Sequence, residues 1–349
     1  MRYSVVQADL QENRDEIVGF WQNNFPAWPR AKYEWFYEGN PSGSALCFIM
    51  RDSESGRVVG ATAIFPRRFL VMGRPRTGGI SADLAMDGTH RTLGPALKLQ
   101  RAALPPTDRS PVDFCYGYPN RNAEAVLKRL GYKVLGTNRR LVRVLKSRTF
   151  VDRRVTVPFT AAVIAGILDF SSRLFAKETR YRQPTGLQTE ILAAFDERFD
   201  HLWQQASPRF SIIAERTMDV LNWRFTHCPY RDYRIFALSR KSTGEILGYV
   251  VYDIRANSLS VADLFVADMD NYLDVLLSEF LLAQRAADVD SLAVTYFGNE
   301  TLVRTLKAFG FVERESGGNI VVHTTPDSEL SSALLDDSNW YLMDGDNDV

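Results

Sequence analysis

The stretch ADLAMDGTHRTLGPALKLQRAAL, residues 82–104, decides the fold. It begins as a strand, turns through a polar loop and continues with the periodicity of a helix. A helix N-terminus presents unpaired backbone N–H groups and the positive end of the helix dipole, so it can hold an anion. Gly94 leaves room for a phosphate, Pro95 fits the first helical turn and Arg91 adds a fixed positive charge. The stretch is therefore either a phosphate cradle or an ordinary helix start after a strand.

The same stretch belongs to a repeat that covers most of the chain. Its strand triplet Ala-Asp-Leu, centred on Asp83, recurs around Asp263. Three pairs of segments align in the same order along the sequence, which indicates a tandem duplication. The aligned pairs are 35–60 with 223–248, 82–84 with 262–264, and 120–132 with 299–311.

Each copy has the same predicted order of elements. A helical region precedes a hairpin, and a third strand, a helix, a buried strand and a second helix follow. Gly131 and Gly310 end the second helices, and a last strand closes each copy. Strands that alternate with helices after a hairpin predict an α/β protein of the α+β type, with mixed sheets. The predicted strands and main helix are 45–51, 57–65, 79–86, 93–103 and 112–118 in the first copy, and 234–239, 246–252, 258–266, 273–287 and 291–297 in the second.

The repeat also predicts the domain organisation. We expect domains at residues 1–146 and 187–325, joined by a connector at 147–186 whose uncharged run predicts an apolar helix. Seven acidic residues and no Lys or Arg follow Ser316. Residues 326–349 are therefore expected to be an acidic, mobile appendage.

Composition limits the classes of function. Of the 349 residues, 45% are hydrophobic and 24% are charged, which is typical of a soluble globular protein. Basic and acidic residues balance at 42 each, and the mild basic excess before Ser316 is too weak and scattered to indicate nucleic-acid binding, so we expect no nucleic-acid partner. Three well-separated cysteines indicate reduced thiols in a cytoplasmic protein, and no apolar run is long enough to insert stably into a membrane. No HExxH or Cys/His spacing is present, so we expect no metal.

Two motifs resemble those of a known family. Residues 91–96, RTLGPA, match the Q/R-x-x-G-x-G/A signature of the GNAT acetyltransferases, and residues 120–132 are similar to a later motif of that family. The resemblance covers residues 2–145 well and residues 187–324 more loosely. It implies two GNAT-like acyl-CoA N-acyltransferase folds in tandem, with acetyl-CoA or another acyl-CoA as co-substrate.

The resemblance also implies a set of site residues. The pyrophosphate of the CoA would lie on the backbone amides of residues 91–96, and the pantetheine arm would follow the preceding strand. Asp83, at the end of that strand, would be the base that removes a proton from the acceptor amine, unless it is a structural residue as in the second copy. The residues implied in binding the co-substrate are Leu84, Met86, Arg91, Thr92, Leu93, Gly94, Pro95, Ala96 and Asn120.

The second copy departs from the family pattern at the anion turn. Its aligned turn, residues 271–276, has neither the Arg nor the Gly. Asp270 and Asp274 would repel a pyrophosphate at close range. We therefore expect CoA to bind only to the N-terminal copy.

The group that protonates the leaving thiolate is a second departure. Many members of the family have a Tyr shortly before the closing Gly-Phe, but Leu127 and Leu306 occupy that place here. Three nearby tyrosines could protonate the thiolate instead, and the sequence does not rank them. They are Tyr116, Tyr118 and Tyr132.

These observations predict an acyltransferase that moves an acetyl or other short acyl group from acyl-CoA to an amine of a small metabolite or amino sugar. One alternative is a non-catalytic acyl-CoA-binding or scaffolding protein. Another is a Fem-type aminoacyl ligase, against which the match at residues 91–96 and the lack of a long basic coiled-coil arm argue. The aromatic segments 25–37 and 223–233 line an acceptor cleft or anchor the core through Trp35 and Trp223.

Overall fold

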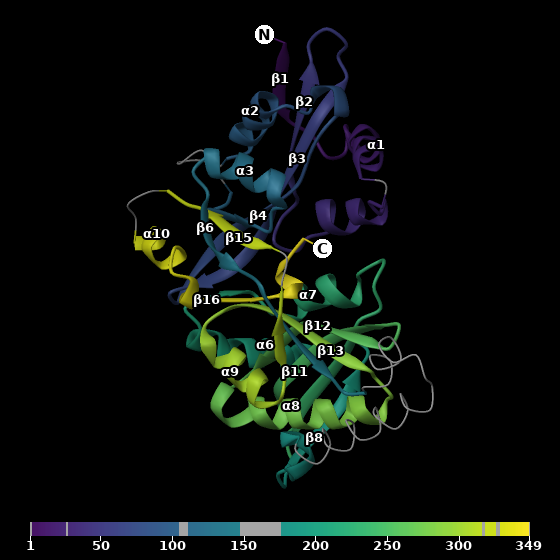
Figure 1. Ribbon diagram of the computed structural model, residues 1–349, viewed down its shortest axis with the longest axis vertical. Helices are drawn as coiled ribbons and strands as arrows, with labels where there is room; N and C mark the ends of the chain where they lie inside the picture. The colour runs from purple at the N-terminus through teal and green to yellow at the C-terminus, as the bar shows by residue number, and fades with distance from the viewer. Residues whose placement is uncertain are drawn as a thin grey trace, which may run out of the picture.

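The structure, a computed structural model, describes residues 2–25, 27–104, 111–146, 176–315, 318–325 and 329–348. Two lobes share one mixed sheet, and Figure 1 shows the N-terminal lobe above the C-terminal lobe. The first copy consists of β1 (Tyr3–Gln7), α1 (Arg14–Asn24), η1 (Tyr33–Glu38), β2 (Leu46–Asp52), β3 (Val58–Val71), β4 (Arg74–Met86), η2 (Gly88–His90), α2 (Leu93–Ala103), β5 (Phe114–Gly117), α3 (Arg121–Arg129), β6 (Lys133–Thr137) and β7 (Arg139–Val144).

The rest of the chain has the same kinds of element. They are η3 (Lys177–Arg180), β8 (Leu187–Leu192), α6 (Glu197–Ala206), η4 (Ser207–Arg209), β9 (Ile212–Ala214), α7 (Met218–Leu221), η5 (Asn222–Thr226), β10 (Arg234–Arg240), β11 (Ile246–Arg255), β12 (Ser258–Val266), α8 (Met269–Ala286), β13 (Ser291–Gly298), α9 (Glu300–Ala308), β14 (Val312–Arg314), β15 (Asn319–His323), α10 (Glu329–Leu334), η6 (Asp337–Asn339), β16 (Trp340–Met343) and η7 (Asp344–Asp346).

The predicted order of strands and helices is present in both lobes, and the predicted α/β class with mixed sheets is confirmed. Neighbouring strands follow the order β1-β2-β3-β4-β5-β15-β6 in the N-terminal lobe and β8-β10-β11-β12-β13-β7-β14 in the C-terminal lobe. In each lobe a helix, α2 or α8, connects a parallel pair of strands, as a crossover requires. The apolar helix expected in the connector falls on residues 147–175, outside the described residues.

The two lobes exchange their last strands. β7 leaves the first copy and pairs with β13 and β14 of the second. In return β15 pairs with β5 and β6, and Figure 1 shows it in yellow beside the blue strands of the N-terminal lobe. The ranges 1–146 and 187–325, which we expected to be the two domains, therefore each complete their sheet with a strand of the other. Either copy alone would leave an open sheet edge.

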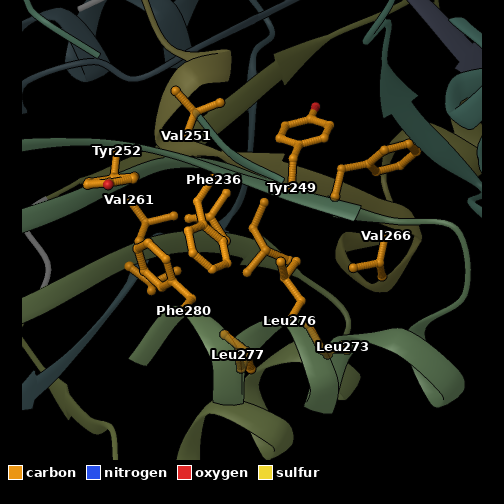
Figure 2. Packing of buried hydrophobic residues seen from close by; sticks show 14 of the residues in the cluster. Phe236, Tyr249, Val251, Tyr252, Val261, Val266, Leu273, Leu276, Leu277 and Phe280 are labelled. Atoms are coloured by element: carbon orange, nitrogen blue, oxygen red, sulfur yellow. The ribbon is translucent and has the colours of Figure 1, made fainter. Parts of the chain in front are cut away.

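Helix α8 shows how the hydrophobic pattern builds the C-terminal lobe. Leu273, Leu276, Leu277 and Phe280 recur at the spacing of one helix face, and each is at most 2% exposed. Figure 2 shows these side chains pointing at the sheet, where the ring of Phe280 lies 5.3 Å from that of Phe236. Burying each of them stabilises the lobe by about 1.5–3 kcal/mol.

Trp35 and Trp223, which align in the repeat, meet where the lobes contact each other. They lie in η1 and η5, and the indole N–H of each donates to the backbone carbonyl of the other, at 2.6 and 2.7 Å. Both are buried, and their rings lie 5.6 Å apart. They therefore anchor the core, the simpler of the two predicted roles, although they do so between the lobes.

The described part of the acidic segment, residues 329–348, is packed, contrary to our expectation of a mobile appendage. Every residue of β16 is at most 2% exposed, and β16 pairs with β9 on one side and with β13 on the other. Because β9 also pairs with β3, the two strands join the half-sheets of the lobes. Four consecutive apolar residues in β16 favour burial, and acidic residues after them pair with buried cations. Figure 1 shows the chain ending between the lobes.

Candidate active site

Strands β4 and β5 separate in the middle of the N-terminal lobe. Their parallel ladder joins only residues 78–80 to residues 114–116. β4 then continues to Met86, and within the described residues it has no strand partner on that side. Since backbone N–H and C=O groups need partners, the edge that includes Leu84 and Met86 can pair with an extended ligand.

The strand leads into the N-terminus of α2, the predicted phosphate cradle. Thr92 is the N-cap, and its side chain makes no capping hydrogen bond. Within the described residues, the N–H groups of Leu93 and Gly94 also have no backbone acceptor. A Cβ built on Gly94 would meet no heavy atom within 4 Å, so the folded chain itself does not require glycine there. The guanidinium of Arg91 donates to the carbonyl oxygen of Met86 at 3.2 and 3.3 Å, which holds its charge beside the turn.

The remaining predicted binding residues differ in their surroundings. Leu93 is 45% exposed, whereas Ala96 is buried against the core beneath α2. Asn120 is the N-cap of α3, and its side chain accepts hydrogen bonds from two backbone N–H groups at 3.0 and 3.1 Å. Asn299 caps α9 in the same way. Helix capping alone therefore accounts for an Asn in both copies.

The corresponding places in the C-terminal lobe are filled by the chain itself. Asp268 caps α8 and accepts from the N–H groups of Asp270 and Asn271, which leaves no open anion site. β12 and β13 also separate, but β16 pairs with β13 at that point. The hydroxyl of Tyr341 on β16 donates to the carbonyl of Leu264 on β12 at 2.5 Å. An extended ligand therefore has no free edge there.

Asp83 lies at a bulge in β4. The register with β3 shifts between Ala61 and Ala63, and Asp83 adopts a left-handed φ of 49°, a conformation that Asp tolerates better than most residues. The side chain of Asp83 is 9% exposed. It accepts hydrogen bonds from Tyr37 Oη at 2.7 Å and Lys32 Nζ at 3.1 Å. The bulge thus directs a carboxylate into a pocket of donors near the open edge of β4.

A second carboxylate reaches this pocket from the C-terminal segment. Asp348 Oδ2 lies 3.8 Å from Lys32 Nζ, whose side chain is 4% exposed. Burial raises the pKa of Asp348; Lys32 opposes the increase and repulsion from Asp83 adds to it. Burial, reinforced by the charge of Asp83, also raises the pKa of Tyr37 well above its usual value. Sequence reasoning missed Asp348, because we expected its segment to be solvated.

The three candidate tyrosines, which the sequence could not rank, differ in their hydrogen-bond partners. Tyr116 donates to the carbonyl of Asp346 at 3.1 Å, and the hydroxyl of Tyr132 lies 2.7 Å from that of Ser81. The hydroxyl of Tyr118 is buried and has no hydrogen-bond partner among the described residues. Tyr118 packs against the same hydrophobic cluster as Tyr37, and burial raises its pKa well above the usual value. Tyr118 is thus the one of the three whose O–H is available to a ligand.

A buried ionic network holds the C-terminal segment over this face. Arg216 Nη2 lies 2.8 Å from Asp346 and 3.1 Å from Asp263, and all three side chains are at most 3% exposed. Arg67 makes a further ion pair with Asp346 at 3.1 Å. The hydroxyl of Tyr249 donates to Asp263 at 2.7 Å. Asp263, the counterpart of Asp83 in the repeat, therefore has a structural role.

Solved structures match this architecture over almost the whole chain. A probable N-acyltransferase from Enterococcus faecalis matches with a TM-score of 0.66 at 12% identity, over 92% of this chain and 72% of its own. A GCN5-related N-acetyltransferase from Anabaena variabilis matches with a TM-score of 0.64 at 13% identity, over 92% and 72%. An N-myristoyltransferase from Saccharomyces cerevisiae with bound myristoyl-CoA matches with a TM-score of 0.55 at 12% identity, over 93% and 79%.

These similarities show that the chain has the fold of the GNAT acyltransferases, as the sequence motifs predicted. No protein-family model matches the sequence, and no curated protein does either. Within the part of the chain that the structure describes, no helix is long and apolar enough to span a membrane. The same residues contain no cluster of three or more His, Cys, Asp or Glu with the geometry of a metal site.

Proposed function

We propose that this protein transfers an acetyl or other short acyl group from acyl-CoA to an amine of a small molecule. The proposal rests on one difference between the lobes, namely that the candidate ligand site is open in the N-terminal lobe and filled in the C-terminal lobe. In the N-terminal lobe the edge of β4 is open and α2 lacks a side-chain cap, while β16 and Asp268 fill the matching places in the C-terminal lobe. Within the described residues, no contact requires a glycine at position 94. An anionic ligand at the N-terminal cradle would account for both the missing side-chain cap of α2 and the glycine at position 94.

The cradle and the strand edge suit different parts of acyl-CoA. The N–H groups of Leu93 and Gly94 and the charge of Arg91 would hold the pyrophosphate. The backbone from Leu84 to Met86 would pair with the amides of the pantetheine arm. The acyl group would then lie near the bulge at Asp83, with its thioester facing the acceptor. Holding both reactants in place supplies a large share of the rate in such a reaction.

Asp83 is the proposed base for the amine. The amine nitrogen attacks the thioester carbonyl carbon, a C–N bond forms, and the C–S bond breaks to release the thiolate. The proton that the nitrogen loses passes to the carboxylate of Asp83, and solvent protonates the thiolate. A positioned carboxylate contributes about 10²–10⁴-fold to such a proton transfer.

Tyr118 is the proposed hydrogen-bond donor to the departing sulfur. Its hydroxyl is buried and has no partner in the part of the chain that the structure describes, so it can donate without first breaking another hydrogen bond. Because its pKa is raised, the phenol keeps its proton and stabilises the thiolate as a donor. This role replaces that of the family Tyr, whose place Leu127 occupies.

The carboxylates of Asp83 and Asp348 would attract an acceptor in its ammonium form, which loses one proton to solvent before the neutral nitrogen attacks the thioester. Both lie within 4 Å of Lys32 Nζ, at 3.1 and 3.8 Å, so the face already accommodates one ammonium group. Small metabolites and amino sugars with a primary amine fit this chemistry.

A calorimetric titration with acetyl-CoA, followed by an acceptor screen with primary amines, tests the proposal. We expect one site per chain and release of free CoA with at least one amine. Two equivalent sites, or binding that survives disruption of the α2 turn, would contradict the assignment to the N-terminal lobe. One site with no turnover on any amine would instead favour a non-catalytic acyl-CoA-binding protein.

A further inference from the structure

The two lobes differ in one row of side chains on the sheet face that meets the C-terminal segment. In the N-terminal lobe, Phe65 on β3 is opposite Ile80 on β4, which is opposite Tyr116 on β5. All three are at most 1% exposed and pack in one hydrophobic cluster. This row is therefore solid core in the first copy.

The matching row in the C-terminal lobe is small and polar. Asp253 on β11 is opposite Ser260 on β12, which is opposite Ala293 on β13. Instead of a packed core, these residues line an open cavity of about 230 Å³, where Ser260 is exposed. About 30 Å³ is the share of one water molecule in the liquid, so the cavity has room for a small metabolite. The two copies therefore differ on this face, which is packed with large side chains in the N-terminal lobe and open in the C-terminal lobe.

Asp253 lies in this cavity with an unsatisfied acceptor. The residue is 6% exposed, and its Oδ1 is buried without a hydrogen-bond partner in the structure. Its Oδ2 lies 3.0 Å from Arg255 Nε. A buried carboxylate oxygen without a donor costs about 1–3 kcal/mol, and more when it is charged. A cationic group in the pocket would compensate the charge of this carboxylate.

Cations complete the lining of the cavity. Arg140 reaches it on the exchanged strand β7, and Arg231 reaches it from the loop before β10. Arg140 is exposed, and within the described residues its side chain has no ion pair or hydrogen bond. Burial lowers the pKa of Arg231, but Tyr233 and the carboxylates of Asp344 and Asp253 outweigh burial and raise it. An anionic group would find guanidinium donors at this end.

Asp344, from the C-terminal segment, adds a second carboxylate to the lining. Burial raises its pKa; the charges of Arg224 and Arg231 oppose the increase, and repulsion from Asp253 and Asp346 reinforces it. The cavity thus joins residues from both copies and from the C-terminal segment. Its lining holds carboxylates and guanidinium groups at once, so a ligand of a single charge would leave one set unmatched.

We propose that this cavity binds a small zwitterion that carries both an ammonium group and a carboxylate, as a free amino acid does. The ammonium group pairs with the carboxylates of Asp253 and Asp344, and the carboxylate accepts from Arg140 and Arg231. The site is separate from the acyl-CoA cradle on β4 and α2, and it stands whether or not the N-terminal lobe transfers acyl groups. Ser260 and Thr295 add hydroxyl groups to the lining.

Calorimetry on the full chain without acyl-CoA tests this proposal. The probes are three zwitterions of increasing length, glycine, 4-aminobutyrate and 6-aminohexanoate, with butyrate and butylamine as singly charged references. We expect at least one zwitterion to bind with a millimolar or lower Kd, at least 10-fold tighter than either reference. Asp253→Asn, which keeps the size of the side chain, and Arg140→Gln should each weaken that binding at least 10-fold. Arg234→Gln, an exposed change on β10, is the matched control.

Three results would overturn the proposal. The first is the absence of millimolar binding for all three zwitterions. The second is butyrate or butylamine binding as tightly as the best zwitterion, which would indicate a simple ion site. The third is zwitterion binding that both cavity variants leave unchanged while their thermal unfolding matches that of the parent. Since Arg140 is exposed, Arg140→Gln keeps the test valid even if Asp253→Asn fails to fold.

Discussion

Position 94 offers the sharpest test of the phosphate cradle. A Cβ at this residue would meet nothing within 4 Å, so Gly94→Ala and Gly94→Glu both leave the packing of the free protein intact. Replacing glycine by alanine in a helix stabilises the folded state by up to about 1 kcal/mol. We therefore expect the Gly94→Ala protein to be as stable as the parent or slightly more stable.

Binding should respond in the opposite direction. A methyl group at Gly94 keeps a phosphate oxygen from approaching the backbone N–H groups to the usual ~2.9 Å, and we expect Gly94→Ala to weaken acetyl-CoA binding about 10-fold. A Glu carboxylate about 5 Å from one phosphate charge adds about 3 kcal/mol of repulsion at an effective dielectric constant of about 20. This corresponds to a loss of about 100-fold or more for Gly94→Glu.

Isothermal calorimetry with acetyl-CoA and thermal unfolding of the same samples measure both effects. Ser242→Glu, which makes the same charge change in an exposed turn of the C-terminal lobe, is the control and should leave the Kd within about 2-fold. If Gly94→Glu binds acetyl-CoA as tightly as the control, the cradle does not hold the pyrophosphate. If both Gly94 variants lose stability, the glycine serves the fold and the reasoning fails.

Three further predictions concern the rest of the molecule. Asp83→Asn should lower kcat by about 10²-fold or more in the acceptor assay while the Kd for acetyl-CoA stays within about 2-fold; an equal kcat would exclude Asp83 as the base. Trp223→Ala should cost about 3–5 kcal/mol in denaturant unfolding, because it removes a buried indole and leaves the carbonyl of Trp35 unpaired; a loss below about 1 kcal/mol would count against the anchor. Burial lowers the pKa of His323 on β15 below its ordinary value of 6.5, so the unfolded chain binds the proton more tightly and stability falls as the pH drops through and below 6.5. His323→Gln should remove this part of the pH dependence, and identical pH profiles for the two proteins would contradict it.

The sequence predicted the features that local patterns encode. The repeat, the alternation of strands and helices and the glycine at position 94 each depend on residues close together in the chain. The predicted strands also begin and end near the observed ones, except that β3 and β4 continue well beyond residue 65 and before residue 79. These outer arms, residues 66–71 and 74–78, contain two Pro and four Arg, a composition that does not favour strands. They are strands because they pair with each other and because β3 also pairs with β9.

The strand exchange could not be read from the sequence. β7 and β15 have the same place in their copies, and the pattern of each is satisfied equally well by either sheet. Only the contacts between the lobes decide which edge each strand joins, and such contacts have no local signature. The role of Asp348 was missed for a related reason. Acidic residues in a row predict solvation, whereas here Arg67 and Arg216 hold the segment in place and so carry Asp348 to Lys32. The apolar run of β16 was the available signal for burial.

The C-terminal segment contacts the candidate ligand site in the N-terminal lobe and the equivalent position in the C-terminal lobe. Its strand β16 pairs along β13 and so fills the gap that a pantetheine arm would need in the C-terminal lobe. The residues after it cross to the N-terminal lobe, where Asp346 pairs with Arg67 and Asp348 reaches the pocket of Asp83. Only a few residues separate β16 from Asp346 and Asp348 along the chain. The C-terminal segment therefore cannot leave the gap beside β13 and keep these ion pairs. Asp348 can therefore complete the pocket of Asp83 in the N-terminal lobe only while β16 fills the gap beside β13 in the C-terminal lobe.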